Sequence, residues 1–294
     1  MFNGLSAFPL TPFKDEKIDE QAFVGFMDRL VDAGVDSIGV LGSTGSYMYL
    51  DRAERRQVIE LAVKQAGNIP VMASISSLRL RDVLRLAEDA QQAGASALLL
   101  APVSYQPLSE QEAYLLYEQV SQQVSVPICV YDNPRTTQFT FSDELHGKIA
   151  ALQHIQSVKI PGISDDAMQA KARVDQLRSV VPDNFSIGIS GDAVAVRGLN
   201  AGCEVWYSVL GSLFPKFCLE MTRHAQAGRA EEALKQSEQL SPIWALFNQH
   251  GSVRVAAAIA IYKKWISAPG LPLPLIPVGS SAIENIEDCL NALE

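Results

Sequence analysis

The stretch DAGVDSIGVLGS, residues 32–43, joins the end of a helix to a buried strand. Its Ala-Gly pair is typical of a helix C-terminus, because glycine accepts the left-handed backbone conformation there. The aliphatic run that follows is typical of a strand buried on both faces. The glycines of the first three such phrases, at positions 34, 67 and 94, are 33 and 27 residues apart, about one strand–helix unit. The further copies are QAGNIPVMASIS (65–76), QAGASALLLAP (92–102) and NAGCEVWYSVLG (200–211).

Eight candidate strands emerge when the pattern is followed outward from these phrases. Amphipathic segments separate them, among them DRAERRQVIELAVKQAG (51–67) and RDVLRLAEDAQQAG (81–94). This alternation predicts a (β/α)8 barrel. A doubly wound sheet is the alternative, but no GxGxxG motif follows the first strand. The candidate strands are LSAFPL (5–10), SIGVLG (37–42), PVMASI (70–75), ALLLAP (97–102), PICVYD (127–132), IQSVKI (155–160), FSIGIS (185–190) and EVWYSV (204–209).

The pattern changes after residue 228, where only helical segments follow. We expect helices over 229–247, 251–267 and 280–293, with the proline-rich connector PGLPLPLIP (269–277) before the last of them. The sequence therefore predicts a barrel domain at 1–228 and a helical region at 229–294 that packs on the barrel.

Composition argues against several classes of protein. The 294-residue chain has a formal net charge of −9 with both signs interspersed, which argues against a nucleic-acid surface. Four dispersed cysteines form no CxxC motif or Cys/His cluster, so we expect neither a disulfide framework nor a metal site. The N-terminus lacks a signal-peptide pattern, and the longest apolar run, 255–262, is too short to span a bilayer. We expect a cytoplasmic protein that binds no membrane.

A lysine in the sixth candidate strand is the first candidate for chemistry. Successive strand residues point to opposite faces, and Val158 and Ile160 must face the outer helices, so Lys159 points into the barrel. Such a lysine can be structural, paired with a buried carboxylate or extended to the barrel rim. Burial also disfavours a charged amine, and a neutral amine can attack a ketone to form a Schiff base.

The same parity places a tyrosine beside the lysine. In the fifth candidate strand Tyr131 points inward, and in the seventh only glycine and serine do, which would leave space. Both Lys159 and Tyr131 fall near the C-terminal ends of their strands, where barrel active sites lie. Tyr131 alone is typical of core packing, but beside a lysine it can carry protons to and from a carbinolamine.

The turn LGSTGS (41–46) follows the second candidate strand at the same rim. One interpretation is an ordinary turn in which Ser43 or Thr44 caps the next helix. The other is a cradle for a carboxylate, built from hydroxyls and free backbone amides. The shared rim with Lys159 and Tyr131 favours the cradle.

Four motifs together resemble the pyruvate-dependent class I aldolases, the family of dihydrodipicolinate synthase and N-acetylneuraminate lyase. They are GSTGS (42–46), YDNP (131–134), SVKIPG (157–162) and SGDA (190–193), in a resemblance that covers the whole chain. It implies an enzyme that forms a Schiff base with pyruvate or a related 2-oxo acid and makes or breaks a bond to an aldehyde. It also implies a homotetramer that needs no metal or other cofactor.

The resemblance also implies roles for individual residues. Lys159 forms the Schiff base, Tyr131 shuttles protons, and Thr44 with its neighbouring serine passes protons to Tyr131 while binding the carboxylate. Other positions match residues that line the pocket of relatives or stand near it. The implied substrate-binding residues are Ser43, Thr44, Gly191, Trp206, Tyr105 and Arg135.

Two departures argue against the lysine-pathway synthase itself. The synthase places an arginine two residues after the proline of its YNxP motif, where a guanidinium suits the carboxylate of aspartate semialdehyde. Here that position is Thr136, with Arg135 one residue early. The synthase also has a tyrosine that reaches a neighbouring subunit, and its position holds Ser104, with Tyr105 one residue later. The sequence therefore favours a different aldehyde.

Other functions stay open from the sequence. A hydratase-aldolase or dehydratase would use the same imine on another carbon skeleton. A non-catalytic ligand-binding barrel would not need both Lys159 and Tyr131. A phosphate-binding barrel would use SGDAVA (190–195) and VLGSLFP (209–215), although neither loop is rich in glycine.

Overall fold

The computed structural model describes residues 1–293 and contains a closed barrel of eight strands in the order β1-β10-β9-β8-β7-β6-β5-β4. Every neighbouring pair is parallel, so the predicted (β/α)8 barrel is confirmed and the open doubly wound sheet is wrong. The barrel strands are β1 (Gly4–Ala7), β4 (Ser37–Val40), β5 (Val71–Ser74), β6 (Ala97–Leu100), β7 (Ile128–Tyr131), β8 (Ile155–Ile160), β9 (Ser186–Ile189) and β10 (Val205–Ser208).

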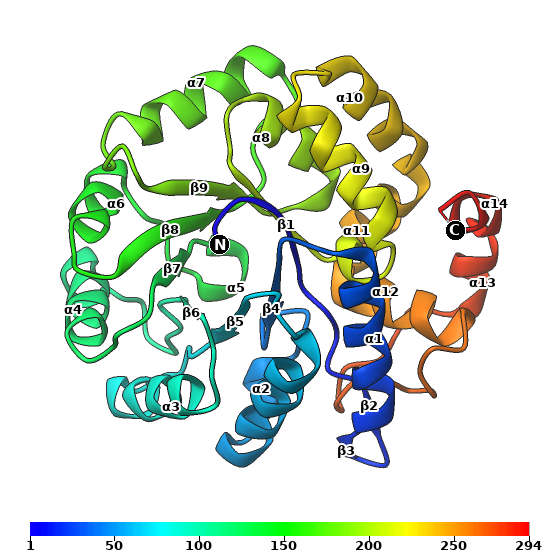
Figure 1. The fold of residues 1–294 in the computed structure, drawn as a ribbon, viewed down its shortest axis with the longest axis horizontal. Coiled ribbons are helices and arrows are strands. Elements are labelled where there is room, and N and C mark those ends of the chain that lie inside the picture. Colours follow the sequence, from blue (N-terminus) through cyan, green and yellow to red (C-terminus); the bar gives the residue numbers. More distant parts are fainter. Residues whose placement is uncertain (294) are drawn as a thin grey trace.

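Helices surround the ring of strands (Figure 1). The Ala-Gly phrases end helices as expected, since Gly34, Gly67, Gly94 and Gly202 all have positive φ. The helices of this part are α1 (Glu20–Ala33), α2 (Arg52–Ala66), α3 (Leu80–Gln92), α4 (Glu110–Ser121), α5 (Pro134–Thr137), α6 (Asp143–Ala150), α7 (Ala167–Arg178), α8 (Ala195–Asn200) and α9 (Pro215–Gln226). Smaller elements are the hairpin β2 (Phe13–Lys14) and β3 (Lys17–Ile18) and the 3-10 turns η1 (Tyr47–Tyr49), η2 (Asp192–Val194) and η3 (Leu210–Ser212).

The C-terminal region is helical but more divided than expected. The single helix predicted over 229–247 is wrong, because the chain breaks at Leu240 and restarts with Pro242 in the first turn. Proline suits a first turn and cannot continue a preceding helix. The segment 280–293 likewise forms two short helices. The C-terminal helices are α10 (Ala230–Gln239), α11 (Ser241–His250), α12 (Ser252–Tyr262), α13 (Ser280–Glu284) and α14 (Glu287–Asn291).

Trp265 joins the C-terminal region to the barrel helices. Its ring meets Phe26 of α1 edge-on at 6.4 Å and Phe214, just before α9, at 5.8 Å. The guanidinium carbon of Arg29 lies 3.3 Å from the centre of a Trp265 ring. One continuous apolar cluster contains residues of both regions, so the helices share the outer core of the barrel. The domain division at residue 228 stays a prediction.

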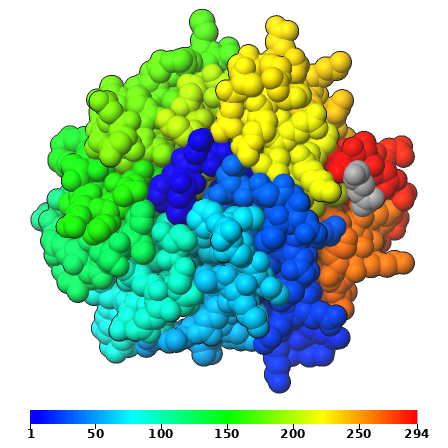
Figure 2. All heavy atoms as spheres, in the orientation of Figure 1, coloured from blue at the N-terminus to red at the C-terminus, as the bar shows by residue number. Residues whose placement is uncertain are grey.

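A second, smaller apolar cluster fills the barrel interior and includes Phe8, Met72, Leu99 and Tyr207. Phe2, from the N-terminal segment, packs against this cluster. The N-terminal residues, dark blue in Figure 2, lie at the centre of the face in view. One end of the barrel is therefore covered by the start of the chain. Within residues 1–293, no helix is both long enough and apolar enough to cross a membrane.

Candidate active site

Lys159 lies inside the barrel on β8, as strand parity predicts. Its Nζ is 3.8 Å from the ring centre of Phe8, 4.6 Å from that of Tyr131 and 5.6 Å from that of Tyr207. The residue is 6% exposed, so it does not extend to solvent. Among residues 1–293 it forms no ion pair with a carboxylate. Neither structural interpretation of this lysine fits, and three aromatic faces surround its amine instead.

Tyr131 on β7 is paired in register with Lys159 on β8. Its hydroxyl accepts a hydrogen bond from Nδ2 of Asn133 at 2.9 Å and lies 3.3 Å from Oγ of Ser43. The phenol is thus held by two polar side chains from two loops at the C-terminal rim, which is more than core packing requires. Asn133 was missed as a site residue, although it stands two residues after Tyr131 in the YDNP motif.

The turn that contains Ser43 and Thr44 does not cap a helix through either hydroxyl. The side chain of Asp51 caps α2 in a reciprocal capping box with Glu54, and η1 has no side-chain cap. The backbone of the turn is tight, with Ser46 at φ 54° and its N–H donating to the Ser43 carbonyl at 3.2 Å. Thr44 is 4% exposed. The helix-cap interpretation is therefore wrong, and Ser43 remains beside the phenol of Tyr131.

Gly191 begins the loop after β9 with φ 88°, a conformation that favours glycine. A Cβ at this position would lie 3.3 Å from Cα of Gly162, so the loops after β8 and β9 approach closely here. The structure places Gly191 at the same rim as Lys159, since β8 and β9 are neighbours in the barrel. Its part in substrate binding stays a prediction.

Trp206 does not point into the barrel, which corrects the expectation that its side chain lines the pocket. It belongs to the outer apolar cluster, whereas its neighbours Val205 and Tyr207 belong to the interior one. The indole N–H donates to Oδ1 of Asp192 at 2.9 Å. The cause is strand parity, which sends Val205 and Tyr207 inward and therefore Trp206 outward.

The side chain of Asp192 links the loops 190–195 and 209–215, which a phosphate-binding barrel would use. Its carboxylate accepts hydrogen bonds from the backbone N–H groups of Val209 at 3.1 Å and Leu210 at 2.7 Å. Burial raises the pKa of this carboxyl, while the hydrogen bonds from Leu210 and Trp206 oppose the shift. The amides that would bind a phosphate are thus already occupied, which argues against that alternative.

Tyr105 and Arg135 lie on the surface of the chain and not in the interior around Lys159. Tyr105 is 88% exposed, and its neighbour Ser104 donates from Oγ to the carbonyl of Gln106 at 2.5 Å. Arg135 is exposed on the short helix α5. Both residues follow barrel strands at their C-terminal ends, so a role at the pocket mouth stays a prediction.

The floor of the site is a small buried polar cluster that the sequence reading missed. The hydroxyl of Tyr207 lies 2.8 Å from Oγ of Ser157 and 3.4 Å from Sγ of Cys129. Burial raises the pKa of Tyr207 well above its ordinary value and that of Cys129 to about 11. Both groups are therefore uncharged at neutral pH. The space expected beside Gly188 is filled, because a Cβ there would lie 2.2 Å from the Tyr207 ring.

Another buried phenol, Tyr47, begins η1 directly after the turn. Burial, and then the nearby Tyr131 phenol, raise the pKa of Tyr47 to about 12. The guanidinium carbon of Arg55 lies 5.3 Å from its ring centre, and Nη1 of Arg55 donates to the Ser76 carbonyl at 2.8 Å. Tyr47 and Arg55 therefore pack beside the 41–46 turn on its outer side, away from the barrel interior.

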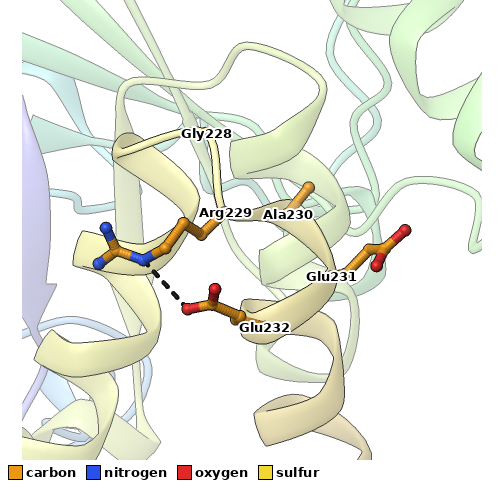
Figure 3. A pocket seen from close by; sticks show the side chains of 5 residues that line it. All are labelled: Gly228, Arg229, Ala230, Glu231 and Glu232. Atoms are coloured by element: carbon orange, nitrogen blue, oxygen red, sulfur yellow. Dashed lines mark ion pairs between the residues drawn. The ribbon is translucent and has the colours of Figure 1, made fainter.

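A separate concave region lies at the turn between α9 and α10 (Figure 3). It is lined by residues 228–232, and Nε of Arg229 is 3.1 Å from Oε2 of Glu232. None of these residues belongs to the interior cluster around Lys159. Throughout residues 1–293, no group of three or more His, Cys, Asp or Glu side chains is arranged to hold a metal ion.

Comparison with known proteins places this geometry in a family. The model of the "Dihydrodipicolinate synthetase family" matches residues 1–293. The 4-hydroxy-tetrahydrodipicolinate synthase of Bartonella quintana (strain Toulouse) is 30% identical over 284 residues, 93% of this chain and 93% of that protein. The enzyme of the same name from Bradyrhizobium diazoefficiens is 27% identical over 280 residues, 94% of this chain and 92% of that protein.

Solved structures agree with these relatives. A crystal structure of dihydrodipicolinate synthase from Agrobacterium tumefaciens str. C58 superposes with a TM-score of 0.95 at 43% identity, covering 100% of this chain and 98% of that one. The family match spans nearly the whole chain, and the motifs around Lys159 and Tyr131 meet at one rim of its barrel. The protein therefore belongs to the dihydrodipicolinate synthetase family.

Proposed function

We propose that the protein is a class I aldolase in which Lys159 forms a Schiff base with pyruvate or a related 2-oxo acid. The observation that carries the proposal is a buried amine with no carboxylate partner among residues 1–293, 4.6 Å from the ring centre of Tyr131, whose hydroxyl adjoins Ser43. Packing alone does not require a buried lysine, and a nucleophilic amine with an adjacent proton carrier suits imine chemistry.

The reaction begins when the neutral amine of Lys159 attacks the C2 carbonyl of the 2-oxo acid. The carbonyl oxygen takes up a proton to give a carbinolamine, and it leaves as water when the imine forms. The Tyr131 hydroxyl supplies and recovers these protons, with Ser43 as its neighbour. Loss of a C3 proton gives an enamine, whose C3 attacks an aldehyde. Hydrolysis of the imine then releases the product and restores the amine.

Ser43 and Thr44 hold the substrate carboxylate in this proposal. The supporting observation is that neither hydroxyl caps a helix, while Oγ of Ser43 lies 3.3 Å from the Tyr131 hydroxyl. Hydroxyls and amides at such a turn bind an anion by convergent hydrogen bonds. Gly191, on the loop after β9 at the same rim as Lys159, completes the proposed binding site.

Trapping with borohydride tests the proposal. The protein is incubated with pyruvate and borohydride, and the intact mass and the Lys159 peptide are measured. One reduced adduct per chain at Lys159 is expected, with no adduct in Lys159→Ala. The matched control Lys171→Ala removes an exposed lysine of α7 and should label normally. The mechanism is wrong if no 2-oxo acid labels the wild-type protein, or if Lys159→Ala still labels.

The synthase reaction with aspartate semialdehyde is the second candidate, because the named relatives are 4-hydroxy-tetrahydrodipicolinate synthases. Thr136 and Ser104 stand where that activity would call for arginine and tyrosine, while Arg135 and Tyr105 are adjacent and exposed. Purified protein is assayed for condensation of pyruvate with aspartate semialdehyde. Efficient turnover would assign the synthase activity, and imine formation without condensation would assign another aldehyde.

We propose a cytoplasmic homotetramer as the working form, from the assembly that the family resemblance implies. The exposed position of Tyr105 supports it, since an aromatic ring that is 88% exposed in one chain is available to a neighbouring subunit. Sedimentation equilibrium of the purified protein tests the assembly. A monomer at micromolar concentration would contradict it.

A further inference from the structure

The side chain of Asn133 does not make the hydrogen bond that its place in the chain predicts. Asn133 is the N-cap residue of α5, and an asparagine there usually accepts a hydrogen bond from a backbone N–H of the first turn. No side-chain cap hydrogen bond is present in α5. Nδ2 of Asn133 instead donates to the hydroxyl of Tyr131 at 2.9 Å. The side chain is therefore directed at the phenol and not at the helix.

The backbone of Asn133 is anchored at the start of α5. Its carbonyl accepts hydrogen bonds from the N–H groups of Thr136 and Thr137, both at 3.0 Å. The buried hydroxyl of Thr137 donates to the same carbonyl at 2.9 Å. Pro134 follows directly and has a restricted φ. These contacts fix the position from which the amide reaches Tyr131.

The adjacent carboxylate of Asp132 has another partner. Oδ2 of Asp132 lies 3.2 Å from Nε2 of His146 on α6, and both side chains are buried. Helix α6 belongs to the outer ring of helices (Figure 1). The hydroxyl of Tyr131 is therefore held by the uncharged side chains of Asn133 and Ser43, and not by this carboxylate.

The two partners of the phenol differ in what they can exchange. An amide nitrogen can only donate, whereas a hydroxyl can donate or accept. The phenol oxygen accepts from Asn133, so its own proton must point to another acceptor. Oγ of Ser43 at 3.3 Å is one acceptor, and the oxygen of a carbinolamine at Lys159 would be another. When the proton leaves, the amide hydrogen bond stabilises the phenolate, because a donor favours a charged oxygen.

We propose that Asn133 is a positioning residue for proton transfer by Tyr131. Its amide turns the phenol proton toward the substrate oxygen and stabilises the phenolate until a proton returns. In each step toward the imine, the phenol gives a proton to that oxygen and recovers one from the nitrogen of Lys159, so the protons balance. Asn133 itself exchanges no proton. The inference rests on the proposed function, because it requires Tyr131 to be the proton carrier.

Timed imine formation with pyruvate tests the inference. Wild-type protein, Asn133→Ala and Asn133→Asp are mixed with pyruvate at several concentrations, and borohydride is added after set intervals. Asn133→Ala should lower the maximal labelling rate at Lys159 by about 10-fold or more, because a hydrogen bond to a charged oxygen is lost. The pyruvate concentration at half-maximal rate should stay the same, since the amide acts on proton transfer and not on binding.

Asn133→Asp replaces the donor by an acceptor of the same shape. An ionised carboxylate draws the phenol proton toward itself, so at about pH 8 the rate should fall further than in Asn133→Ala. A protonated carboxyl can donate again, so the ratio of variant to wild-type rate should rise as the pH falls to about 5. Other ionisable groups nearby are common to both proteins, and their titration cancels in the ratio. They are Lys159, Tyr47 and the pair Asp132 and His146.

Asn200→Asp is the matched control. Asn200 is half-buried at the end of α8, and its amide donates to the Ala230 carbonyl at 3.4 Å. The same chemical change there should leave the labelling rate equal to that of the wild type at every pH.

Two results would overturn the inference. One is a wild-type labelling rate in folded Asn133→Ala, and the other is a pH-independent rate ratio for Asn133→Asp. If the alanine variant does not fold, the pH dependence of Asn133→Asp decides. Absence of any label on wild-type protein overturns the proposed function itself.

Discussion

The aromatic surroundings of Lys159 define its chemistry at the scale of single residues. A buried ammonium without a carboxylate is costly, and ring faces offset only part of that cost. The Tyr131 hydroxyl lies 2.9 Å from Nδ2 of Asn133 and 3.3 Å from Oγ of Ser43, so two polar side chains fix its position. This geometry supports the proposed division of roles, in which Lys159 is the nucleophile and Tyr131 on the neighbouring strand transfers protons.

Tyr131→Phe is expected to keep the fold and lose turnover. The ring still packs against the amine, while the proton carrier is removed, so the rate should fall by about 100-fold or more. Steady-state turnover and thermal unfolding are measured together. Tyr117→Phe is the control, since that phenol donates to the Leu100 carbonyl away from the site and should affect stability alone. Near-normal turnover in Tyr131→Phe would assign this tyrosine to packing.

Thr44→Val is expected to weaken pyruvate binding and slow imine formation together. Valine retains the shape of threonine but lacks the hydroxyl, and a lost hydrogen bond to a charged group costs about 1.5–3 kcal/mol. The concentration dependence of borohydride trapping measures both quantities. If affinity and trapping rate were both unchanged, the carboxylate would be bound elsewhere.

Helix capping shows how the elements around the site divide their roles. α2 begins with a capping box at Asp51, eight residues beyond Ser43. The hydroxyls of the preceding turn are consequently not needed to satisfy the backbone N–H groups of that helix. An element that caps itself leaves the turn before it available for a ligand.

Asp51→Ala should lower stability without changing catalysis. Loss of an N-cap side chain costs ~1 kcal/mol, and the side chain of Asp51 hydrogen-bonds to the first turn of α2. Urea unfolding and the pyruvate trapping rate are measured on this variant and on Thr44→Val. Asp51→Ala should lower the free energy of unfolding and leave the trapping rate unchanged. Thr44→Val should instead lower the trapping rate. A trapping defect in Asp51→Ala of the same size would mean that α2 positions the turn.

Strand parity explains both what the sequence predicted and what it did not. The Ala-Gly phrases and aliphatic runs located the eight strands, and the two-residue period turned Lys159 and Tyr131 inward. The same rule turns Trp206 outward, and the expectation for that residue was wrong because it was taken from relatives and not from parity. Phe8 lies beyond the last residue of β1, where the period no longer applies. Contacts such as that of Phe8 with Gly39 join distant segments and are not encoded locally.

At the scale of the whole molecule, buried acids link stability to alkaline pH. Burial raises the pKa of Cys203 to about 12, as it does that of Tyr47, while the unfolded groups ionise near pH 9 and 10. Because the folded pKa is raised, this stability is fully present below the unfolded pKa and is lost as pH rises through the folded one. The free energy of unfolding should fall from about pH 9 upward.

Cys203→Ala isolates one contribution to this alkaline loss. Each group contributes up to about 1.4 kcal/mol per pH unit between its unfolded and folded pKa. Urea unfolding at pH 8 to 11 should give a shallower decline for the variant than for the wild type. Cys289→Ala is the control, because that thiol is only partly buried. Parallel curves for wild type and Cys203→Ala would contradict the assignment.

The covering of one barrel end by the N-terminal segment leaves the opposite, C-terminal rim as the side from which reactants reach Lys159 in the proposed mechanism. Phe2 packs against the interior cluster at the covered end. In that mechanism the enamine forms before the aldehyde reacts, so the keto acid binds first. Excess aldehyde that binds to the free enzyme should therefore inhibit competitively against pyruvate in initial-rate measurements. A fold that closes one side of its interior thus makes the order of binding a property that kinetics can measure.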